Sequence, residues 1–452
     1  MWWILELAVG TFLAASTIAS PISPSTANKR YLEEQDGVKY NVFEHSATKS
    51  RLSFVKNSGI CETTPGVNQY SGYLSVGEGM NMWFWFFEAR ENPRQAPLVA
   101  YFEGGPGDAS EYGFFTQNVP CHFVNNETSP SLNPYSVGFS YGNATVNSTK
   151  AAAPLVWNLL QAFYDSFPEY ENRDFGIFTE SYGGHYGPEF ASYILDQNAA
   201  ISRGDLHAEE IRLVALGVSN GWFDATIQEK ANIEYLYNNS YRQLINETFY
   251  KELLTRYDTK CKPAFDRCAD VGTTDTCFAA WKSCMDEIEY PILGVLNKDH
   301  PGFYLGDIRD PSLRAPSTHV AYLQRLDVQE ALGAKVNYSE PAGAAGFIYS
   351  GDVVDARSFM TQLSAVVQAS VRVVVWTGDA DYVSNWLGTL RVVDLIEWPG
   401  KKTFTNQDMT PYTLNGTQKG VFKSLDNLTF MRIFEAGHHV PFYRTFKLTR
   451  PD

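Results

Sequence analysis

Five short apolar runs, each ending in a turn of glycine or other small residues, constrain the fold of this chain more than any other feature. The runs are Met82–Phe87, Leu98–Phe102, Phe175–Phe178, Val371–Trp376 and Phe430–Phe434. Helical patterns follow several of them, as at Tyr186–Leu195 and Trp386–Trp398. Strand, turn and helix in repeated succession indicate a mainly parallel central sheet with helices on both faces. We therefore predict an α/β fold in which the first two runs are neighbouring strands.

The pattern changes between residues 221 and 346, where polar, helix-like segments replace the apolar runs. We interpret this part as a helical cap inserted between two core segments, residues 48–220 and 347–452. Four of the six cysteines lie in the cap, at Cys261, Cys268, Cys277 and Cys284. Zinc ribbons place about two to four residues between ligands, whereas at least six residues separate these cysteines. Disulfides in an oxidising compartment are therefore the better interpretation.

A nested arrangement of these disulfides would staple a small helical hairpin. It joins Cys261 to Cys284 around a bond between Cys268 and Cys277. The two remaining cysteines, Cys61 and Cys121, are then left to pair with each other.

The N-terminal residues indicate secretion. Residues 1–20 are mostly apolar and end in small residues, which is typical of a secretory signal peptide cleaved near Ala19 or Ser20. Residues 21–47 then form an N-terminal segment and candidate propeptide. The alternative, a membrane anchor, needs about 20 uninterrupted apolar residues, and Glu6 interrupts this run.

Eight Asn-x-Ser/Thr sequons support a glycosylated protein that is secreted or, as the alternative, sorted to a vacuole. They begin at Asn126, Asn143, Asn147, Asn238, Asn246, Asn337, Asn415 and Asn427. One sequon alone is weak evidence, but eight in one chain agree with the signal peptide.

The formal net charge of −15, from 36 basic and 51 acidic side chains among 452 residues, limits the partners. Nucleic acids and anionic membrane surfaces are negatively charged themselves, so neither is expected as the main partner. The sequence contains no H-E-x-x-H motif and no nucleotide-binding glycine loop. We therefore expect neither a metal nor an organic cofactor.

Three candidate catalytic residues, Ser181, Asp381 and His438, each follow the end of a different predicted strand. In open α/β sheets that edge is where ligands bind. Ser181 lies in a strand-to-helix turn similar to G-x-S-x-G, with Thr179 in the first glycine position. A serine hydroxyl becomes a good nucleophile when an imidazole takes its proton, and a carboxylate must hold that imidazole. The order Ser, Asp, His is that of α/β hydrolases; the alternative is a structural serine and a helix-capping aspartate.

Longer sequence blocks surround these residues. They include Ser71-Gly72-Tyr73-Leu74, Trp85-Phe86-Phe87-Glu88, Gly104-Gly105-Pro106-Gly107, Glu180-Ser181-Tyr182-Gly183-Gly184-His185-Tyr186, Asn220-Gly221, Gly378-Asp379-Ala380-Asp381, Asn385-Trp386-Leu387-Gly388 and Ala436-Gly437-His438-His439-Val440-Pro441. With these blocks the chain resembles the serine carboxypeptidases of the α/β-hydrolase superfamily, the group that includes carboxypeptidase Y, from about Cys61 onward. The spacings of the four cap cysteines also match that family's nested disulfides.

The resemblance implies a role for each residue. Ser181 would be the nucleophile, His438 the general base and then acid, and Asp381 the group that orients His438. The backbone N–H groups of Gly105 and Tyr182 would form the oxyanion hole. Family members remove residues one at a time from peptide C-termini, and they hold the free carboxylate with an asparagine and a pair of glutamic acids that share protons. A carboxylic acid donates to a carboxylate only while protonated, which implies a preference for acidic conditions.

This chain departs from the family at the carboxylate-binding residues. Glu180 is retained beside the nucleophile, but Gln117 stands at the other acid, and Glu103, before Gly104, stands at the asparagine position. We predict that Glu103 and Glu180 share the proton beside the Gly104 backbone, while Gln117 donates through its amide. The alternative is that Glu103 faces solvent and carboxylate binding is weakened.

Two larger departures concern the sheet. Ser136 runs directly into Val137, so that by comparison with the family about 15 residues are absent, including a central strand of about 5–6 residues. Beyond Pro441 the family has a long helix that packs on the sheet, whereas this chain ends at Asp452. The expected fold therefore lacks one central strand and the C-terminal helix. An error in assigning the exons of the gene would explain both departures.

The sequence thus predicts a secreted, glycosylated serine-type carboxypeptidase that releases C-terminal amino acids through an acyl-enzyme at acidic pH. Its partners would be peptides or proteins with a free C-terminus. One alternative is an esterase or acyltransferase on the same scaffold. Another is a non-catalytic secreted relative, which the missing strand suggests and the intact triad argues against.

Overall fold

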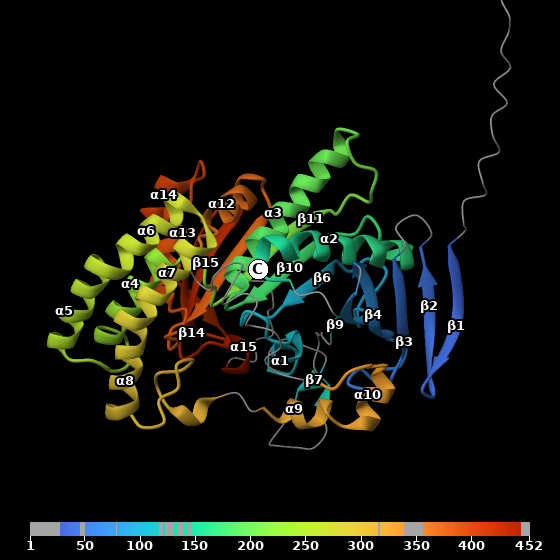
Figure 1. Cartoon of the computed structure of the whole chain (residues 1–452), viewed down its shortest axis with the longest axis horizontal. Coiled ribbons are helices and arrows are strands. Elements are labelled where there is room, and N and C mark those ends of the chain that lie inside the picture. Colours follow the sequence, from blue (N-terminus) through green and yellow to red (C-terminus); the bar gives the residue numbers. More distant parts are fainter. Residues whose placement is uncertain are drawn as a thin grey trace, which may run out of the picture.

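The computed structural model describes residues 28–45, 50–77, 79–116, 121–122, 131–132, 140–142, 146–314, 317–338 and 356–443. Its centre is a seven-stranded sheet in the order β13-β14-β15-β12-β11-β10-β6 (Figure 1). Five of these strands are parallel, namely β6 (Leu98–Phe102), β10 (Phe175–Glu180), β11 (Leu213–Ser219), β12 (Arg372–Gly378) and β15 (Leu428–Ile433). The antiparallel strands β14 (Thr417–Leu425) and β13 (Thr410–Leu414) extend the sheet beyond β15. The mainly parallel sheet that the sequence predicted is present.

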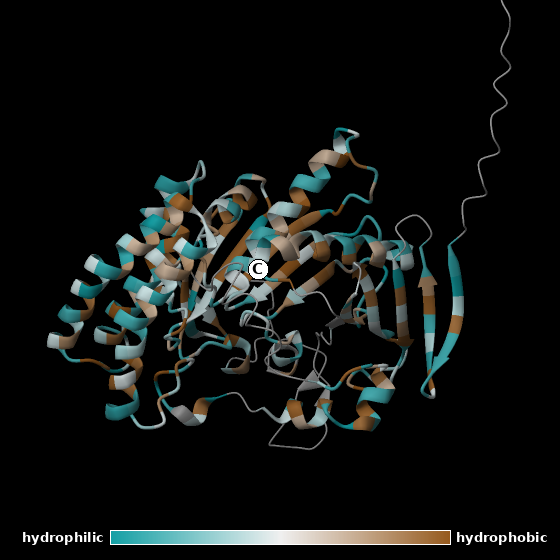
Figure 2. Cartoon of the chain, viewed as in Figure 1, coloured by the Kyte–Doolittle hydropathy of each residue, from teal (hydrophilic) through white to brown (hydrophobic). Residues whose placement is uncertain are grey.

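The parallel strands form because their side chains are apolar on both faces. Val373 and Val375 on one face of β12 have no exposed area, and the other face carries the apolar, partly buried Val374 and Trp376. Such near-continuous apolar runs are typical of parallel strands buried on both sides, and Figure 2 shows the central strands as hydrophobic. Four of the five predicted runs, all except Met82–Phe87, lie in this sheet. The central strand β11 was not among the predicted runs.

Helices pack against the central sheet. They are α3 (Gly183–Ser202), α12 (Met360–Gln368), α13 (Trp386–Leu395) and α14 (Lys401–Thr405). Helix α2 (Thr149–Ser166), followed by the short η1 (Pro168–Tyr170), instead contacts α3 and the strands β3 (Arg51–Lys56) and β4 (Gln69–Gly77). Helix α3 contacts β10 and β11, whereas α13 contacts β12 and β15. The side chains of Ser148 and Asn385 cap the first turns of α2 and α13 by accepting backbone N–H groups. The caps fix where each helix begins relative to the strand edge.

A second, antiparallel sheet is built mainly from the N-terminal part of the chain. Its order is β1 (Lys29–Gln35), β2 (Val38–Glu44), β3 (Arg51–Lys56), β4 (Gln69–Gly77), β5 (Met80–Phe87) and β9 (Tyr141–Gly142). A separate two-stranded pair joins β7 (Cys121–His122) and β8 (Ser131–Leu132). The hairpin β1-β2 falls within the candidate propeptide, yet β2 pairs with β3 along four residues. Residues 29–44 are therefore an integral part of this sheet.

Strands β5 and β6, which the sequence predicted to be neighbours, belong to two different sheets. Strand β5 pairs with β4 and β9, whereas β6 pairs with β10. Among the described residues no strand pairs with both β5 and β6, since the two-residue β9 pairs with β5 alone, and Val99 in β6 is half exposed. The predicted adjacency is wrong, because the strand that would join the two sheets is absent from the described part of the chain. The junction of Ser136 and Val137 falls in residues 133–139, outside the described residues.

The predicted cap contains a cluster of helices beside the central sheet (Figure 1). It comprises α4 (Ala225–Tyr237), α5 (Glu247–Arg256), η2 (Tyr257–Cys261), α6 (Lys262–Val271), α7 (Thr274–Cys284), η3 (Met285–Glu289) and α8 (Tyr290–Asp299). Disulfides join Cys261 to Cys284 and Cys268 to Cys277, in the nested order expected from the sequence. Leu253, Ile288 and Ile292 are fully buried and form the apolar centre of the cap.

Shorter elements complete the described structure. They are α1 (Ser110–Thr116), η4 (Pro311–Leu313), α9 (Thr318–Leu323), α10 (Leu326–Leu332) and α15 (Val440–Tyr443). Cys61 also takes part in a disulfide, while the side chain of its expected partner, Cys121, lies outside the described residues.

The sequons differ in how well they can accept a glycan. Asn147, Asn238, Asn246, Asn337 and Asn415 are exposed. Asn427 instead donates its amide N–H groups to the carbonyls of Val367 and Val371, at 2.9 and 2.6 Å. A glycan on that nitrogen would break these bonds, so the structure argues against glycosylation at Asn427. Asn126 and Asn143 lie outside the described residues, as does the signal peptide.

A search of the described helices finds none that combines the length and the apolar character needed to cross a bilayer.

We predict that the transcript contains an in-frame segment of about 15 codons between those for Ser136 and Val137, long enough for a strand of about 5–6 residues and its turn. The physical reason is that β6 pairs with only one strand among the described residues, since backbone groups left unpaired cost about 1–3 kcal/mol each where they are buried. Sequencing complementary DNA across this junction tests the prediction. A transcript that encodes the two residues side by side contradicts it.

Candidate active site

Ser181 lies in a sharp turn between β10 and α3. Its φ of +60° falls in the left-handed region, which is strained for a residue with a side chain. The turn is held because the Ser181 N–H donates to the Ser219 carbonyl at 3.0 Å and the Ser181 carbonyl accepts from the Trp222 N–H at 2.8 Å. Glycine is needed at Gly183, where a Cβ would lie 2.4 Å from Cβ of Thr179. The turn thus has the geometry of a nucleophile elbow with threonine in the first glycine position.

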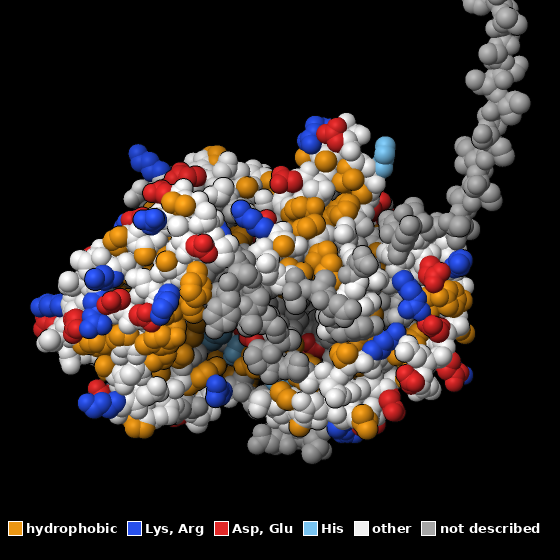
Figure 3. Space-filling model, in the orientation of Figure 1, with side chains coloured by type: hydrophobic (Ala, Val, Ile, Leu, Met, Phe, Trp, Pro, Cys, Tyr) orange, Lys and Arg blue, Asp and Glu red, His pale blue; other side chains and the backbone are white. Residues whose placement is uncertain are grey.

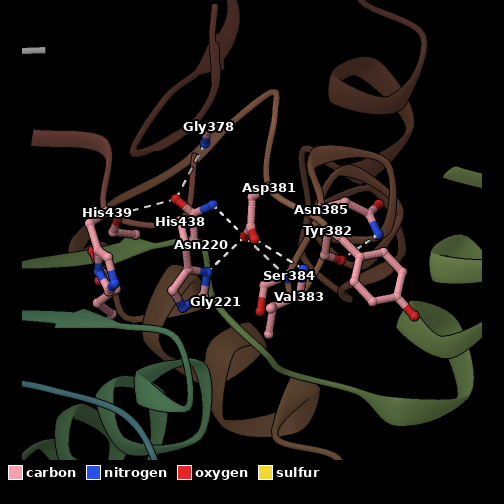
Figure 4. A network of polar contacts seen from close by, with 12 residues as sticks. Asn220, Gly221, Gly378, Asp381, Tyr382, Val383, Ser384, Asn385, His438 and His439 are labelled. Carbon is pink, nitrogen blue, oxygen red and sulfur yellow. Dashed lines mark hydrogen bonds and ion pairs between the residues drawn. The ribbon is translucent and has the colours of Figure 1, made fainter. Parts of the chain in front are cut away.

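Asp381 follows β12 and is fully buried. Its Oδ2 accepts hydrogen bonds from Nδ1 of His438 at 2.8 Å, from Nδ2 of Asn220 at 2.7 Å and from the Ser384 N–H at 3.1 Å. Its Oδ1 accepts from the Val383 N–H at 3.0 Å (Figure 4). A buried carboxylate is tolerated when donors replace its hydration, and these four donors also fix the direction in which it faces His438.

His438 follows β15 and its backbone is anchored to the segment after the cap helices. Its N–H donates to the Gly306 carbonyl at 2.7 Å, and a Cβ at Gly437 would lie 2.3 Å from that same oxygen. Burial alone lowers the pKa of His438, but the charge and hydrogen bond of Asp381 outweigh it and Glu180 and Glu103 add to it, so the net pKa is raised. The site therefore favours an imidazolium, the form that the ring takes when it has accepted a proton from serine.

The sheet topology brings these side chains to one edge. Strands β10, β11, β12 and β15 are adjacent and parallel, so that Ser181, Asn220, Asp381 and His438 follow their carboxyl ends. In Figure 3 a histidine and acidic side chains are visible in the hollow at the centre of this face. This is the placement that the sequence predicted for its three candidate catalytic residues.

Asn220 is a site residue that the sequence analysis named in a family-like block but to which it assigned no role. Besides its bond to Asp381, its Oδ1 accepts the Gly378 N–H at 3.3 Å, and its φ is +44°. It thus ties the carboxylate to the end of β12. The available signal was its position directly after a short apolar run ending in Ser219, as with the other strand ends.

The glycine loop after β6 lies against the nucleophile elbow. A Cβ at Gly104 would lie 2.6 Å from the Tyr182 nitrogen and 2.7 Å from Cβ of Ser181. Gly105 has a φ of +104°, which favours glycine. The backbone of this loop can therefore approach Ser181 closely only because these positions carry no side chain.

Glu103 is buried, with 4% of its surface exposed, which contradicts the alternative that it faces solvent. Its Oε2 accepts a hydrogen bond from the Tyr101 hydroxyl at 2.9 Å, and its Oε1 accepts the Gly104 N–H at 3.2 Å. Burial, reinforced by the charge of Glu180, raises the pKa of Glu103 to about 8. Its carboxyl group therefore carries a proton through the acidic and neutral range.

Glu180 is fully buried at the end of β10. Its Oε1 forms a hydrogen bond with Nδ1 of His439, the residue after His438. The sequence reasoning assigned no role to His439. Gln117, the predicted amide donor, lies outside the described residues.

Comparison with known proteins agrees with this geometry. The serine carboxypeptidase family model matches residues 59–449. The chain is 53% identical over 410 residues to carboxypeptidase S1 of Penicillium janthinellum, an alignment that covers 86% of this chain and 95% of that protein. The chain belongs to the serine carboxypeptidase family.

More distant relatives agree with the assignment. Carboxypeptidase Y of Schizosaccharomyces pombe is 30% identical over 454 residues, which cover 94% of this chain and 44% of that protein. The solved structure of Kex1(delta)p, a prohormone-processing carboxypeptidase from Saccharomyces cerevisiae, aligns with a TM-score of 0.67 at 18% identity over 83% of this chain and 88% of that one. This serine-type carboxypeptidase has the α/β-hydrolase fold that the sequence predicted.

Replacing Asn220 by alanine should lower kcat of the carboxypeptidase about 10–100-fold, because Asp381 loses a charge-assisted hydrogen bond of about 1.5–3 kcal/mol. Steady-state kinetics measures the loss. Asn406→Ala is the matched control, since it also removes one amide donor, to the Lys402 carbonyl, at an exposed position. Equal kcat values for the two variants would contradict a role of Asn220 in orienting Asp381.

Proposed function

We propose that this chain releases C-terminal amino acids from peptides by an acyl-enzyme mechanism in which Ser181 is the nucleophile. The observation that carries the proposal is the hydrogen bond between Asp381 and His438 at the strand edge where the Ser181 elbow also lies. Asp381 holds the imidazole with Nδ1 toward the carboxylate, which leaves Nε2 for the serine proton. After attack on the carbonyl, the imidazolium gives that proton to the departing amino acid.

The oxyanion that forms during attack would be stabilised by the backbone N–H groups of Gly105 and Tyr182. Tyr182 is the residue that precedes the first turn of α3, where N–H groups point outward. The close contact of Gly104 with Tyr182 supports a common pocket for the two donors. Each such donor is worth about 2.7–4 kcal/mol of transition-state stabilisation.

The free carboxylate of the substrate would be held by Glu103, Glu180, the Gly104 backbone and Gln117. Glu103 is the acid best suited to donate, because its raised pKa of about 8 keeps it protonated. The charge of Glu180 contributes to that rise, which supports a proton shared between the two acids.

The pH dependence of the reaction follows from two residues that must be in opposite protonation states, a neutral His438 and a protonated Glu103. His438 must be neutral to accept the serine proton, so kcat increases with pH. Glu103 must be protonated to bind the substrate carboxylate, so binding weakens above pH 8. A protonated Glu103 supports binding of the substrate carboxylate in acidic conditions and extends that binding to neutral pH.

We also propose that the protein is secreted or vacuolar. The signal-like residues 1–20, the exposed sequons and the cap disulfides support an oxidising secretory route.

We expect a peptide with a free C-terminus to be cleaved with a kcat/KM about 10–100-fold above that of its amidated form, as one charge-assisted hydrogen bond of about 1.5–3 kcal/mol predicts. The Ser181→Ala variant should lose at least about 10⁴-fold in kcat. Chromatography of the released amino acid measures both. Preference for the amidated or esterified form would favour an esterase or acyltransferase, and failure of Ser181 to react with an organophosphonate probe would favour a non-catalytic relative.

Glu103→Gln should abolish the rise of KM above pH 8, because an amide donates a hydrogen bond at every pH. In the unsubstituted protein KM for the free peptide should increase about 10-fold per pH unit above about 8, as expected when one proton is lost. The peptide amide is the control substrate, since it has no carboxylate to be recognised. An unchanged KM profile in the variant would refute the assignment of Glu103.

A further inference from the structure

His439 links the acid beside the nucleophile to helix α1. Its Nδ1 forms a hydrogen bond with Oε1 of Glu180, and its Nε2 forms another, of 2.8 Å, with the Tyr112 hydroxyl. The imidazole and the Tyr112 ring meet edge to face, with centroids 4.8 Å apart. The side chain is buried and both ring nitrogens are occupied, so its orientation is fixed.

The ring of His439 is neutral at pH 6.5, well above its pKa. Burial and the neighbouring charge of His438 lower the pKa of His439 to about 4, although several acids oppose this. The titratable groups that face it are His438, Glu180, Glu103, Asp381, Asp108 and Tyr112. A neutral imidazole has one N–H, so one of its two contacts must be a donor and the other an acceptor.

The partners decide which nitrogen carries the hydrogen. Tyr112 can donate its O–H to Nε2, which leaves Nδ1–H to donate to a Glu180 carboxylate. The reverse arrangement requires a protonated Glu180 that donates into Nδ1. The charge of Glu180 is among the causes that raise the pKa of Glu103, which fits an arrangement with Glu180 as the carboxylate and the proton on Glu103.

We propose that His439 is a positioning residue that donates its Nδ1–H to Glu180, keeps that acid as the carboxylate, and so leaves the proton for substrate recognition on Glu103. This inference rests on the proposed carboxylate-binding role of Glu103. It assigns different protonation states to the two acids, whereas the sequence reasoning left the proton shared between them.

Removing the Nδ1–H donor of His439 should move the proton from Glu103 to Glu180. A buried carboxylate that loses a hydrogen-bond donor binds a proton more tightly, so in the variant Glu180 competes with Glu103 for the proton. Glu103 then becomes an anion and repels the carboxylate of the substrate. Acidification supplies a second proton, which restores the donor on Glu103.

The test is the pH dependence of KM for a free peptide in His439→Leu, which removes both hydrogen bonds at similar volume. We expect KM to rise about 10-fold at pH 6.5 and to return to within about threefold of the unsubstituted protein at pH 4, with a smaller change in kcat. His439→Asn, whose amide can donate from near the Nδ1 position, should recover most of the loss. An increase in KM that is equal at both pH values indicates lost packing and overturns the proposal.

A further variant, at Tyr112, keeps the test decisive if His439→Leu does not fold. Tyr112→Phe keeps the ring but removes the hydroxyl that donates to Nε2 of His439. We expect its KM for the free peptide to rise about threefold at pH 6.5 and, as in His439→Leu, to rise less at pH 4. If His439→Leu does not fold, this variant decides alone, and a pH-independent KM overturns the proposal.

In the Glu103→Gln background the pH-dependent part of the His439→Leu effect should vanish, because residue 103 no longer holds a titrating proton. If Glu103→Gln itself leaves the KM profile unchanged, the proposed function of Glu103 fails. If Glu103→Gln behaves as expected and His439→Leu does not, only the role of His439 fails.

Discussion

The burial of the Asp381 carboxylate is the interaction on which the site depends. Four hydrogen bonds compensate its desolvation, from the His438 ring, the Asn220 amide and two backbone N–H groups that follow β12. These donors belong to segments that follow three different strands, so the charge is stable only when β11, β12 and β15 are in register. The orientation of the His438 ring therefore depends on the register of these strands. The elbow of Ser181, bonded to the end of β11, is placed by the same register.

The buried acids Asp381 and Glu103 lie in two different electrostatic environments. Asp381 is matched by hydrogen-bond donors and serves the imidazole of His438, whereas Glu103 is held in a setting that raises its pKa to about 8. Two acids in one pocket with different environments take different roles, since desolvation favours the neutral form of one and donors favour the anion of the other. His439 contacts residues of both environments, because it forms a hydrogen bond with Glu180 and its ring packs edge to face against His438.

Sequence reasoning predicted the parallel sheet, the three candidate catalytic residues and the nested cap disulfides, because each leaves a local signal. Apolar runs, the turn after β10 and the cysteine spacings can be read without knowledge of distant contacts. It wrongly predicted that β5 and β6 are neighbours, because an apolar run indicates a strand but does not indicate which strand it pairs with. It also left Asn427 as a glycosylation site, although that amide is used to bind two carbonyls of residues about 60 positions earlier.

The sequence by itself determined which side chains can perform the chemistry, since the identity and order of Ser181, Asp381 and His438 are local facts. Only the tertiary structure decided which groups set their charge. Burial of Glu103, the Asn220 contact and the Glu180–His439–Tyr112 hydrogen bonds all join segments that are far apart in the chain. A pKa depends on desolvation and on the nearest donors and charges. Those are properties of the folded neighbourhood, which no local pattern in the sequence specifies.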